Sequence, residues 1–98
     1  MLTLSEPKYF KRIKVDEINE IPWGKGGVYF IEDRFGEVIY IGKTVSFRRR
    51  LMEHVRDSYF SAVIYTIRLY EMKDGFTREI YETYLINKYR PYYNKDKI

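Results

Sequence analysis

The sequence predicts an α+β domain in which a small, three-stranded, mostly antiparallel sheet is flanked by helices, in the order β-β-α-β-α. Residues 27–31, 38–42 and 63–71 are rich in β-branched and aromatic side chains, which favour strands. Residues 47–57 and 77–89 instead space their apolar side chains three or four positions apart, as helices that cover a sheet do. Segments of both kinds alternate along the chain, which indicates that helices pack on the sheet.

The first part of the chain shows little regular pattern. Residues 1–12 are rich in charge and predict a loosely held lead-in. Ile18 and Ile21 lie three positions apart and indicate one short helical turn, which Pro22 ends because proline lacks the N–H that a helix interior needs. We expect the whole 98-residue chain to form one domain, with its core in residues 21–95.

The first two predicted strands form a hairpin that allows two registers. The segment between them, residues 33–36, has aspartate at its first and glycine at its last position, as tight turns often do. A turn centred within this segment places Tyr29 opposite Tyr40, on one face of the sheet. A bulge at Gly36 would shift the pairing by one residue and send the two rings to opposite faces.

Both predicted helices have a capping residue and an apolar stripe. Ser46 is the expected N-cap of the first helix and Thr77 that of the second, and Pro91 ends the second helix. The side chains expected to face inward are Phe47, Leu51 and Val55 from the first helix and Ile80, Tyr84 and Leu85 from the second.

Composition and charge restrict the classes of function. The net charge of +4 favours a polyanionic partner such as nucleic acid. The absence of cysteine excludes disulfides and thiolate metal sites, and no apolar run approaches the roughly 20 residues of a membrane span. Because no signal-peptide pattern begins the chain, we expect a cytoplasmic protein with no membrane partner. The 11 tyrosines are expected mainly in packing, and the remainder as stacking surfaces, phosphate donors or proton acceptors.

Basic side chains on the first predicted helix suit phosphate chemistry. Arg50 and His54 lie one turn apart at the edge of the apolar stripe, where a guanidinium can grip a phosphate through two hydrogen bonds. Arg48, Arg49 and Arg56 point more toward solvent. An ordinary solvated basic run explains the same arginines, so these residues alone favour only a small basic domain that binds nucleic acid.

Five short motifs, taken together, resemble the GIY-YIG nuclease family. In order, they are Ile21-Pro22, Gly27-Val28-Tyr29, Tyr40-Ile41-Gly42-Lys43, Phe47-Arg48-Arg49-Arg50-Leu51 followed by His54, and the block from Glu82 to Asn94. The likeness covers residues 21–95 and extends to the N-terminal incision domain of the bacterial excision-repair nuclease. The departures are conservative: valine replaces the name-giving isoleucine, and the hairpin loop is about one residue longer.

The resemblance implies a metal-dependent endonuclease that hydrolyses DNA phosphodiester bonds by a one-metal mechanism. Glu82 falls on the position of the metal-binding glutamate, and Arg50 on that of the arginine that grips the phosphate. The cofactor implied is Mg²⁺ or Mn²⁺, which would have few protein ligands because no cluster of ligand residues with metal-site spacing occurs in the sequence. The further nucleic-acid contacts expected are Lys43, Arg48, Arg49 and Arg56.

The resemblance also implies a tyrosine general base, which is either Tyr29 or Tyr40. A tyrosine pKa of about 10 must fall for this role, and neighbouring cations would lower it. His54 or Lys43 is expected to assist the proton transfer. Asn94 is expected to orient a tyrosine or a metal-bound water by hydrogen bonds.

These groups must converge on one phosphorus if they share a mechanism. The residues expected on one sheet face and in one pocket are Tyr29, Tyr40, Arg50, His54 and Glu82. This requires direct pairing of the two tyrosines, or a second irregularity that restores their common face. The apolar side chains expected on the other face are Val28, Phe30, Ile39 and Ile41.

Two other classes of function fit the sequence less well. One is a non-catalytic nucleic-acid-binding module on the same fold, which is disfavoured because every position with an implied catalytic role carries a suitable residue. The other is a protein-interaction domain whose tyrosines are all structural. The expected substrate is DNA, structured or damaged, and a partner protein or an additional DNA-binding domain would supply specificity.

Overall fold

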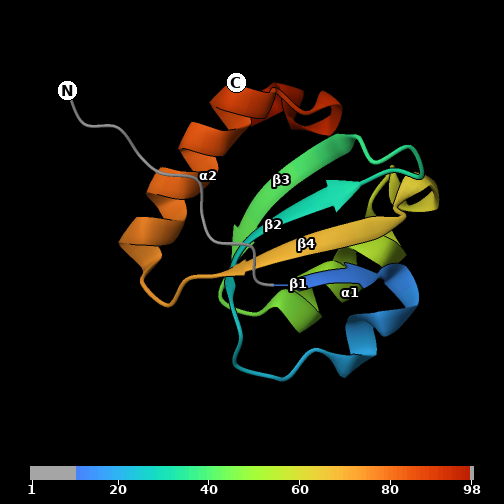
Figure 1. Cartoon of the computed structure of the whole chain (residues 1–98), viewed down its shortest axis with the longest axis horizontal. Coiled ribbons are helices and arrows are strands. Elements are labelled where there is room, and N and C mark those ends of the chain that lie inside the picture. Colours follow the sequence, from blue (N-terminus) through green and yellow to red (C-terminus); the bar gives the residue numbers. More distant parts are fainter. Residues whose placement is uncertain (1–10, 98) are drawn as a thin grey trace.

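The α+β class is confirmed by the structure, a computed structural model that describes residues 11–97 (Figure 1). The strands are β1 (Lys11–Lys14), β2 (Gly27–Glu32), β3 (Val38–Thr44) and β4 (Thr66–Glu71). The α-helices are α1 (Phe47–Asp57) and α2 (Gly75–Tyr89), and the 3-10 helices are η1 (Val15–Glu20), η2 (Ser61–Val63) and η3 (Tyr92–Lys97). Within the described residues, no helix has the length and apolar character needed to cross a bilayer.

The sheet has the strand order β1-β4-β2-β3, and every pairing is antiparallel. The three predicted strands are present, although β4 begins at Thr66 because residues 61–63 form η2. The fourth strand, β1, falls in the segment expected to be a lead-in, and residues 1–10 of that segment lie outside the described residues. Ile13 is its one buried side chain, so the segment is too short to show the alternation that identifies strands.

A buried carboxylate joins three of the strands. Glu32 at the end of β2 pairs with Arg12 of β1 at 3.2 Å and with Arg68 of β4 at 3.1 Å. Its other oxygen accepts a hydrogen bond from the hydroxyl of Thr66 at 2.9 Å. Because a buried charge needs several partners, this cluster favours the docking of β1 on β4.

The β2–β3 hairpin contains both the bulge and the second irregularity considered from the sequence. Gly36 has a φ of 80°, and its N–H donates to the carbonyl oxygen of Asp33 at 3.0 Å. The pairing then shifts again between Ile31 and Glu32, where Ile39 is the extra residue. The two shifts of one residue run in the same direction and add up to two positions, which restores the original alternation of faces, so Tyr29 and Tyr40 share a face.

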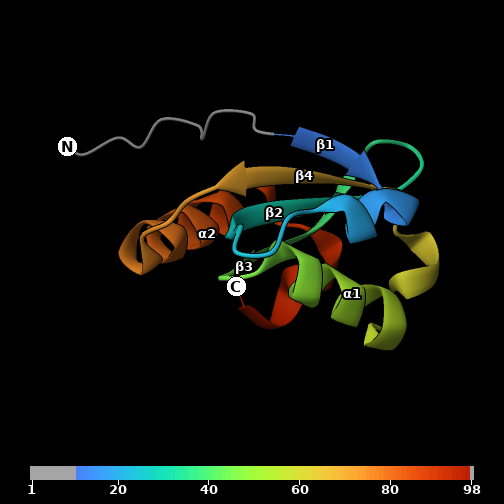
Figure 2. The same cartoon turned by 90° about the horizontal axis from the view of Figure 1, so that it is seen from below.

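The two faces of the sheet pack separate cores. The face with the two tyrosines packs against α1 and η1 around Phe47 and Leu51. The opposite face packs against α2 around Leu85 and Ile86, with Val28, Phe30 and Ile41 as predicted. Ile39 instead belongs to the tyrosine face, which corrects the prediction, because the second bulge turns its side chain over. Figure 2 shows α1 and the C-terminal η3 on the same side, below β3.

The first helix has the predicted ends, with Ser46 as N-cap accepting a hydrogen bond from the N–H of Arg49 at 3.3 Å. Its buried face differs from the prediction. Val55 is exposed, and His54 takes the inward position after Leu51. The side chain three positions after Leu51, rather than four, therefore faces the sheet, and it is polar.

The second helix begins earlier than predicted. Its N-cap is Asp74, whose carboxylate accepts hydrogen bonds from the N–H of Thr77 at 2.9 Å and from its hydroxyl at 3.0 Å. Thr77 is thus the partner of the cap rather than the cap. Of the three side chains expected to face inward, Leu85 is buried, whereas Ile80 and Tyr84 are half-buried.

Candidate active site

The ring of Tyr29 occupies space that a glycine leaves free. Tyr29 lies directly opposite Gly42 in the β2–β3 pairing, and Tyr40 lies two pairs further along, opposite Ile31. A side chain at Gly42 would overlap the Tyr29 hydroxyl and crowd the Tyr40 ring, so the glycine of this motif is required by packing. The two tyrosine rings stack with centroids 6.2 Å apart and an interplanar angle of 27°.

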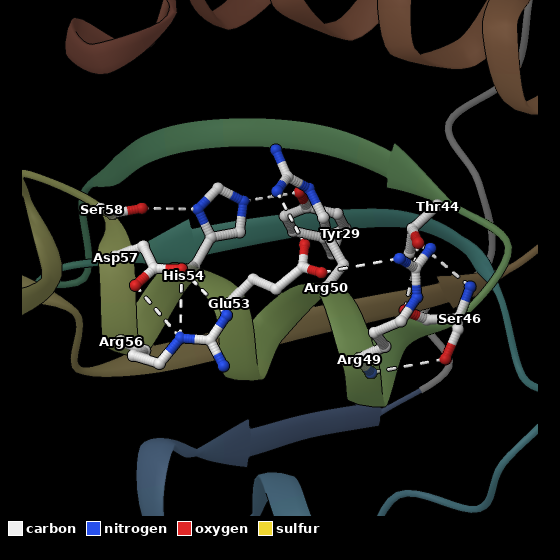
Figure 3. Close-up of polar contacts among 10 residues, drawn as sticks. All are labelled: Tyr29, Thr44, Ser46, Arg49, Arg50, Glu53, His54, Arg56, Asp57 and Ser58. Atoms are coloured by element: carbon white, nitrogen blue, oxygen red, sulfur yellow. Dashed lines mark hydrogen bonds and ion pairs between the residues drawn. The ribbon is translucent and has the colours of Figure 1, made fainter.

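A hydrogen-bonded chain of three side chains runs through this site (Figure 3). The Tyr29 hydroxyl lies 2.7 Å from His54 Nε2, and His54 Nδ1 lies 2.7 Å from the Ser58 hydroxyl. A neutral imidazole has one N–H and one acceptor nitrogen, so one of the two hydroxyls accepts a hydrogen bond from the ring and the other donates one to it. Ser58 did not emerge from the sequence, where its only signal is its place one helical turn after His54.

The environment of Tyr29 makes its phenolate unfavourable. Burial raises the pKa of Tyr29 well above its usual value, and Tyr40 raises it further. Arg50 lies beside the hydroxyl in Figure 3 and lowers the pKa, but its effect does not offset that of burial. Arg50 therefore lowers the pKa of Tyr29 as expected of a neighbouring cation, but burial outweighs this effect and the net pKa is raised.

Arg50 extends from α1 toward the tyrosines and is half exposed. Its Nη1 lies 3.1 Å from a carboxylate oxygen of Glu53, and the other oxygen lies 3.5 Å from Arg49 (Figure 3). A carboxylate between two arginines holds both guanidinium groups along the same side of the helix. Glu53 is a second residue of this neighbourhood that the sequence did not single out.

Glu82 and Lys43 approach the site from the other side of the sheet. Glu82 is buried on α2, and its charge contributes to the raised pKa of Tyr29, which places the two side chains within electrostatic reach. Lys43 lies 3.9 Å from Glu79, one turn before Glu82 on the same helix. The tyrosines, Arg50 and His54 therefore share one face as predicted, whereas Glu82 belongs to α2, which packs on the opposite face of the sheet, and this corrects the prediction of a single face.

The residues around Glu82 fit a hard divalent cation. Among the described residues, no three histidine, cysteine or acidic side chains are grouped as a metal site. A carboxylate oxygen is a preferred ligand of Mg²⁺, which commonly keeps most of its waters and takes further oxygens from a phosphate. Glu82 alone therefore fits as the protein ligand of such an ion.

Asn94 makes different contacts from those expected. Its side-chain oxygen accepts a hydrogen bond from the N–H of Ile41 at 2.7 Å, and its amide nitrogen donates to the Ile41 carbonyl at 2.9 Å. Both groups belong to the outer edge of β3, which has no neighbouring strand within the described sheet and needs partners. Asn94 thus holds the backbone between Tyr40 and Gly42.

The other arginines expected to contact nucleic acid lie along α1, and each already has a partner. The Arg48 guanidinium stacks over the ring of Trp23 at 4.4 Å. Arg56 pairs with Asp57 at 2.9 Å, and Arg49 pairs with Glu53 at 3.5 Å. The structure thus places this basic run beside the site, on the surface of the helix that carries Arg50 and His54.

Known proteins share this sequence pattern and this fold. The family profile of the GIY-YIG catalytic domain matches residues 25–96. The uncharacterized protein YurQ of Bacillus subtilis is 31% identical over 99 residues, covering 96% of this chain and 80% of that protein. UvrABC system protein C of Synechocystis is 42% identical over 55 residues, which are 56% of this chain and only 8% of that longer protein.

Solved structures agree with these sequence relatives. The GIY-YIG N-terminal endonuclease domain of UvrC from Thermotoga maritima, bound to magnesium as its catalytic divalent cation, superimposes with a TM-score of 0.69 at 25% identity. The match covers 81% of this chain and 97% of that one. Because the family profile spans most of the sequence, and because the fold is shared, the chain belongs to the GIY-YIG catalytic domain family of endonucleases.

Proposed function

We propose that this nuclease hydrolyses DNA phosphodiester bonds with one divalent cation, Mg²⁺ or Mn²⁺, and a tyrosine general base. The observation that carries the proposal is the convergence of two helices on the edge strand β3. From one side, α1 brings Arg50 and His54 to the tyrosine pair, and from the other side α2 brings Glu82. A phosphate at this edge would meet a guanidinium, a phenol and a metal-binding carboxylate together.

Tyr40 is the general base in this proposal. The Tyr29 side chain is 0% exposed and its hydroxyl is hydrogen-bonded to His54, so an attacking water has no access to it. Tyr40 retains 8% exposure and packs against the same imidazole, with ring centroids 4.9 Å apart. Arg50 interacts electrostatically with both phenols. Tyr29 acts by holding His54.

Arg50 and Glu82 have complementary tasks at the phosphate. Glu82 would hold the divalent cation, which would supply positive charge at the phosphate. Arg50 binds the remaining phosphate oxygens, where negative charge grows in the transition state. Lys43, beside Glu79, adds positive charge on the Glu82 side of the edge strand.

The substrate class rests on charge and on the relatives. The net charge of +4 favours DNA, and the similar UvrC domains are parts of much longer proteins, of which this chain covers 8% and 15%. We therefore infer that the chain is one catalytic domain and that a partner protein or another domain contributes specificity. The alternative of a non-catalytic module is less well supported, because no implied catalytic position is lost.

The metal site is tested by a pair of variants on α2. Glu82→Gln should abolish Mg²⁺-dependent nicking of a supercoiled plasmid, because an amide binds the cation much more weakly than a carboxylate. Glu79→Gln, one turn earlier and exposed, is the matched control and should still cut. Thermal unfolding would show that both variants fold. Undiminished nicking by Glu82→Gln would overturn the proposed metal site.

A further inference from the structure

A groove of about 1050 Å³ lies at the hairpin end of the sheet, away from Glu82. It is bounded by the β2–β3 turn, by η2 and the start of β4, and by the junction of α2 and η3. Figure 1 shows the hairpin turn and η2 at this same end of the sheet. The proposed catalytic residues do not line this groove, so its composition requires a separate explanation.

Aromatic rings dominate the exposed part of this groove. The exposed aromatic side chains that line it are Phe35, Tyr65, Tyr89 and Tyr92. Phe35 is 79% exposed and Tyr92 is 63% exposed, although rings of this size are usually buried. Exposed aromatic rings gathered in one groove indicate a binding site. Several tyrosines of this tyrosine-rich chain would therefore serve in binding rather than in the core.

The charged groups of the groove favour an anion. Arg34 and Arg90 are exposed at its rim, and the Arg34 guanidinium lies 5.0 Å from the centroid of the Phe35 ring. Two acidic residues, Asp33 and Glu37, also line the groove. The carboxylate of Asp33 is engaged by its own turn, where it accepts hydrogen bonds from the N–H groups of Phe35 at 2.9 Å and Glu37 at 3.0 Å. Arginines interleaved with open aromatic rings are typical of surfaces that bind single-stranded nucleic acid.

The groove is connected to the proposed base by stacked rings. Tyr93 lines the groove and stacks on Phe60, with centroids 4.7 Å apart and an interplanar angle of 16°. Phe60 in turn stacks on Tyr40 at 5.3 Å. These three rings place one wall of the groove two stacked rings away from Tyr40.

We propose that this groove binds an unpaired DNA strand next to the cleavage point. Its bases stack on the exposed rings, and its phosphates pair with Arg34 and Arg90. The inference rests on the proposed nuclease function and names its substrate class, which is DNA with a single-stranded segment beside the scissile phosphate. A continuous duplex does not fit, because its bases are stacked on one another and present no free faces to the rings.

Binding without cutting tests this proposal. The full chain, in EDTA, would be titrated by fluorescence anisotropy against a labelled oligothymidylate of about 12 nucleotides and against a duplex of the same length. We expect about tenfold tighter binding of the single strand, and a loss of most of that preference in the double variant Phe35→Ala, Tyr92→Ala. The matched control is Phe76→Ala, which removes a ring that is 73% exposed at the start of α2 and outside the groove.

The outcomes separate this inference from the proposed chemistry. Equal affinity for single strand and duplex, or an equal loss in the Phe76→Ala control, would overturn the groove assignment. Glu82→Gln should bind the oligothymidylate as the unaltered chain does, because the groove lies apart from Glu82. Persistent cutting by that variant would refute the metal site while the single-strand preference still stood.

Discussion

Tyr29 and Tyr40 carry the same side chain on the same sheet face, yet their surroundings give them different tasks. Tyr29 is enclosed and hydrogen-bonded to His54, whereas Tyr40 keeps a small exposed surface. Tyr40→Phe should therefore lower the single-turnover cleavage rate by roughly two to four orders of magnitude, as loss of a general base does. A gel-based time course with excess enzyme would measure this rate.

The matched change, Tyr29→Phe, should act mainly on stability. It leaves His54 Nε2 without its 2.7 Å partner in a buried site, which costs about 1–3 kcal/mol of unfolding free energy. Denaturant unfolding would measure the loss. If Tyr29→Phe abolished cleavage and Tyr40→Phe did not, Tyr29 would be the base.

The role of a residue could be predicted where the residue stands in a recognisable motif. It could not be predicted where the role depends on a contact between residues distant in the sequence. The sequence placed Tyr40, Arg50 and Glu82 in one site because each stands in a recognisable motif. It did not predict that Asn94 would bind the backbone of Ile41, since those residues are far apart in sequence. It also missed Ser58, because a serine at a helix end is ordinarily a cap or a surface residue.

At the scale of elements, the last turn of α1 holds the imidazole in place. His54 is the single histidine of the chain, so its ring nitrogens can be followed by NMR without ambiguity. Ser58→Ala should change the ¹⁵N shift of His54 Nδ1, because this nitrogen loses its hydrogen-bond partner. Ser58→Thr, which keeps the hydroxyl, should restore the original shifts.

A control at the other end of the same helix distinguishes an effect on the His54 ring from an effect on the stability of the protein. Ser46→Ala removes the N-cap hydrogen bond and should cost about 1 kcal/mol without altering the His54 spectrum. Unchanged nitrogen shifts in Ser58→Ala would show that Ser58 does not hold the ring.

The elements themselves were predicted best where sequence signals are local. The capping serine and the apolar spacing set the ends of α1, and β-branched runs set β2 and β3. The strand β1 was missed because its place depends on the distant pairing of Arg12 with Glu32. The start of α2 was two residues off because Asp74 and Thr77 are both good caps, and only the structure shows which one accepts the hydrogen bonds.

At the scale of the whole molecule, positive charge is spread along α1, while the residues of this helix that we propose to be catalytic, Arg50 and His54, lie at its inner edge. Arg56 is exposed and paired with Asp57, so Arg56→Ala should reduce the slope of log affinity against log salt by about one and leave the cleavage rate at saturating DNA unchanged. Arg50→Ala should instead lower that rate by roughly two to three orders of magnitude. Binding measured as a function of salt and cleavage rates at saturating DNA would distinguish the two substitutions. Equal, mild effects of both would indicate that the two arginines belong to an ordinary basic surface.

The two-sided construction of the site was beyond local sequence reasoning. Alternation along a strand predicts which side chains share a face, and it predicted the tyrosine face correctly after the register was known. The alternation gives no information about side chains from a helix on the other face of the sheet, such as Glu82 on α2. That arrangement follows from β3 being at the edge of the described sheet.

The two bulges of the β2–β3 hairpin restrict how its length can change, because an odd or an even number of bulges decides whether the two tyrosines share a face. Each one-residue bulge exchanges the faces of every side chain beyond it, so an even number keeps Tyr29 and Tyr40 together and an odd number separates them. Deleting one residue from the turn would therefore invert the site, while deleting two, or adding two, would preserve it. A relative with a functional site and a hairpin one residue shorter should accordingly have one bulge fewer, which keeps the two tyrosines on one face.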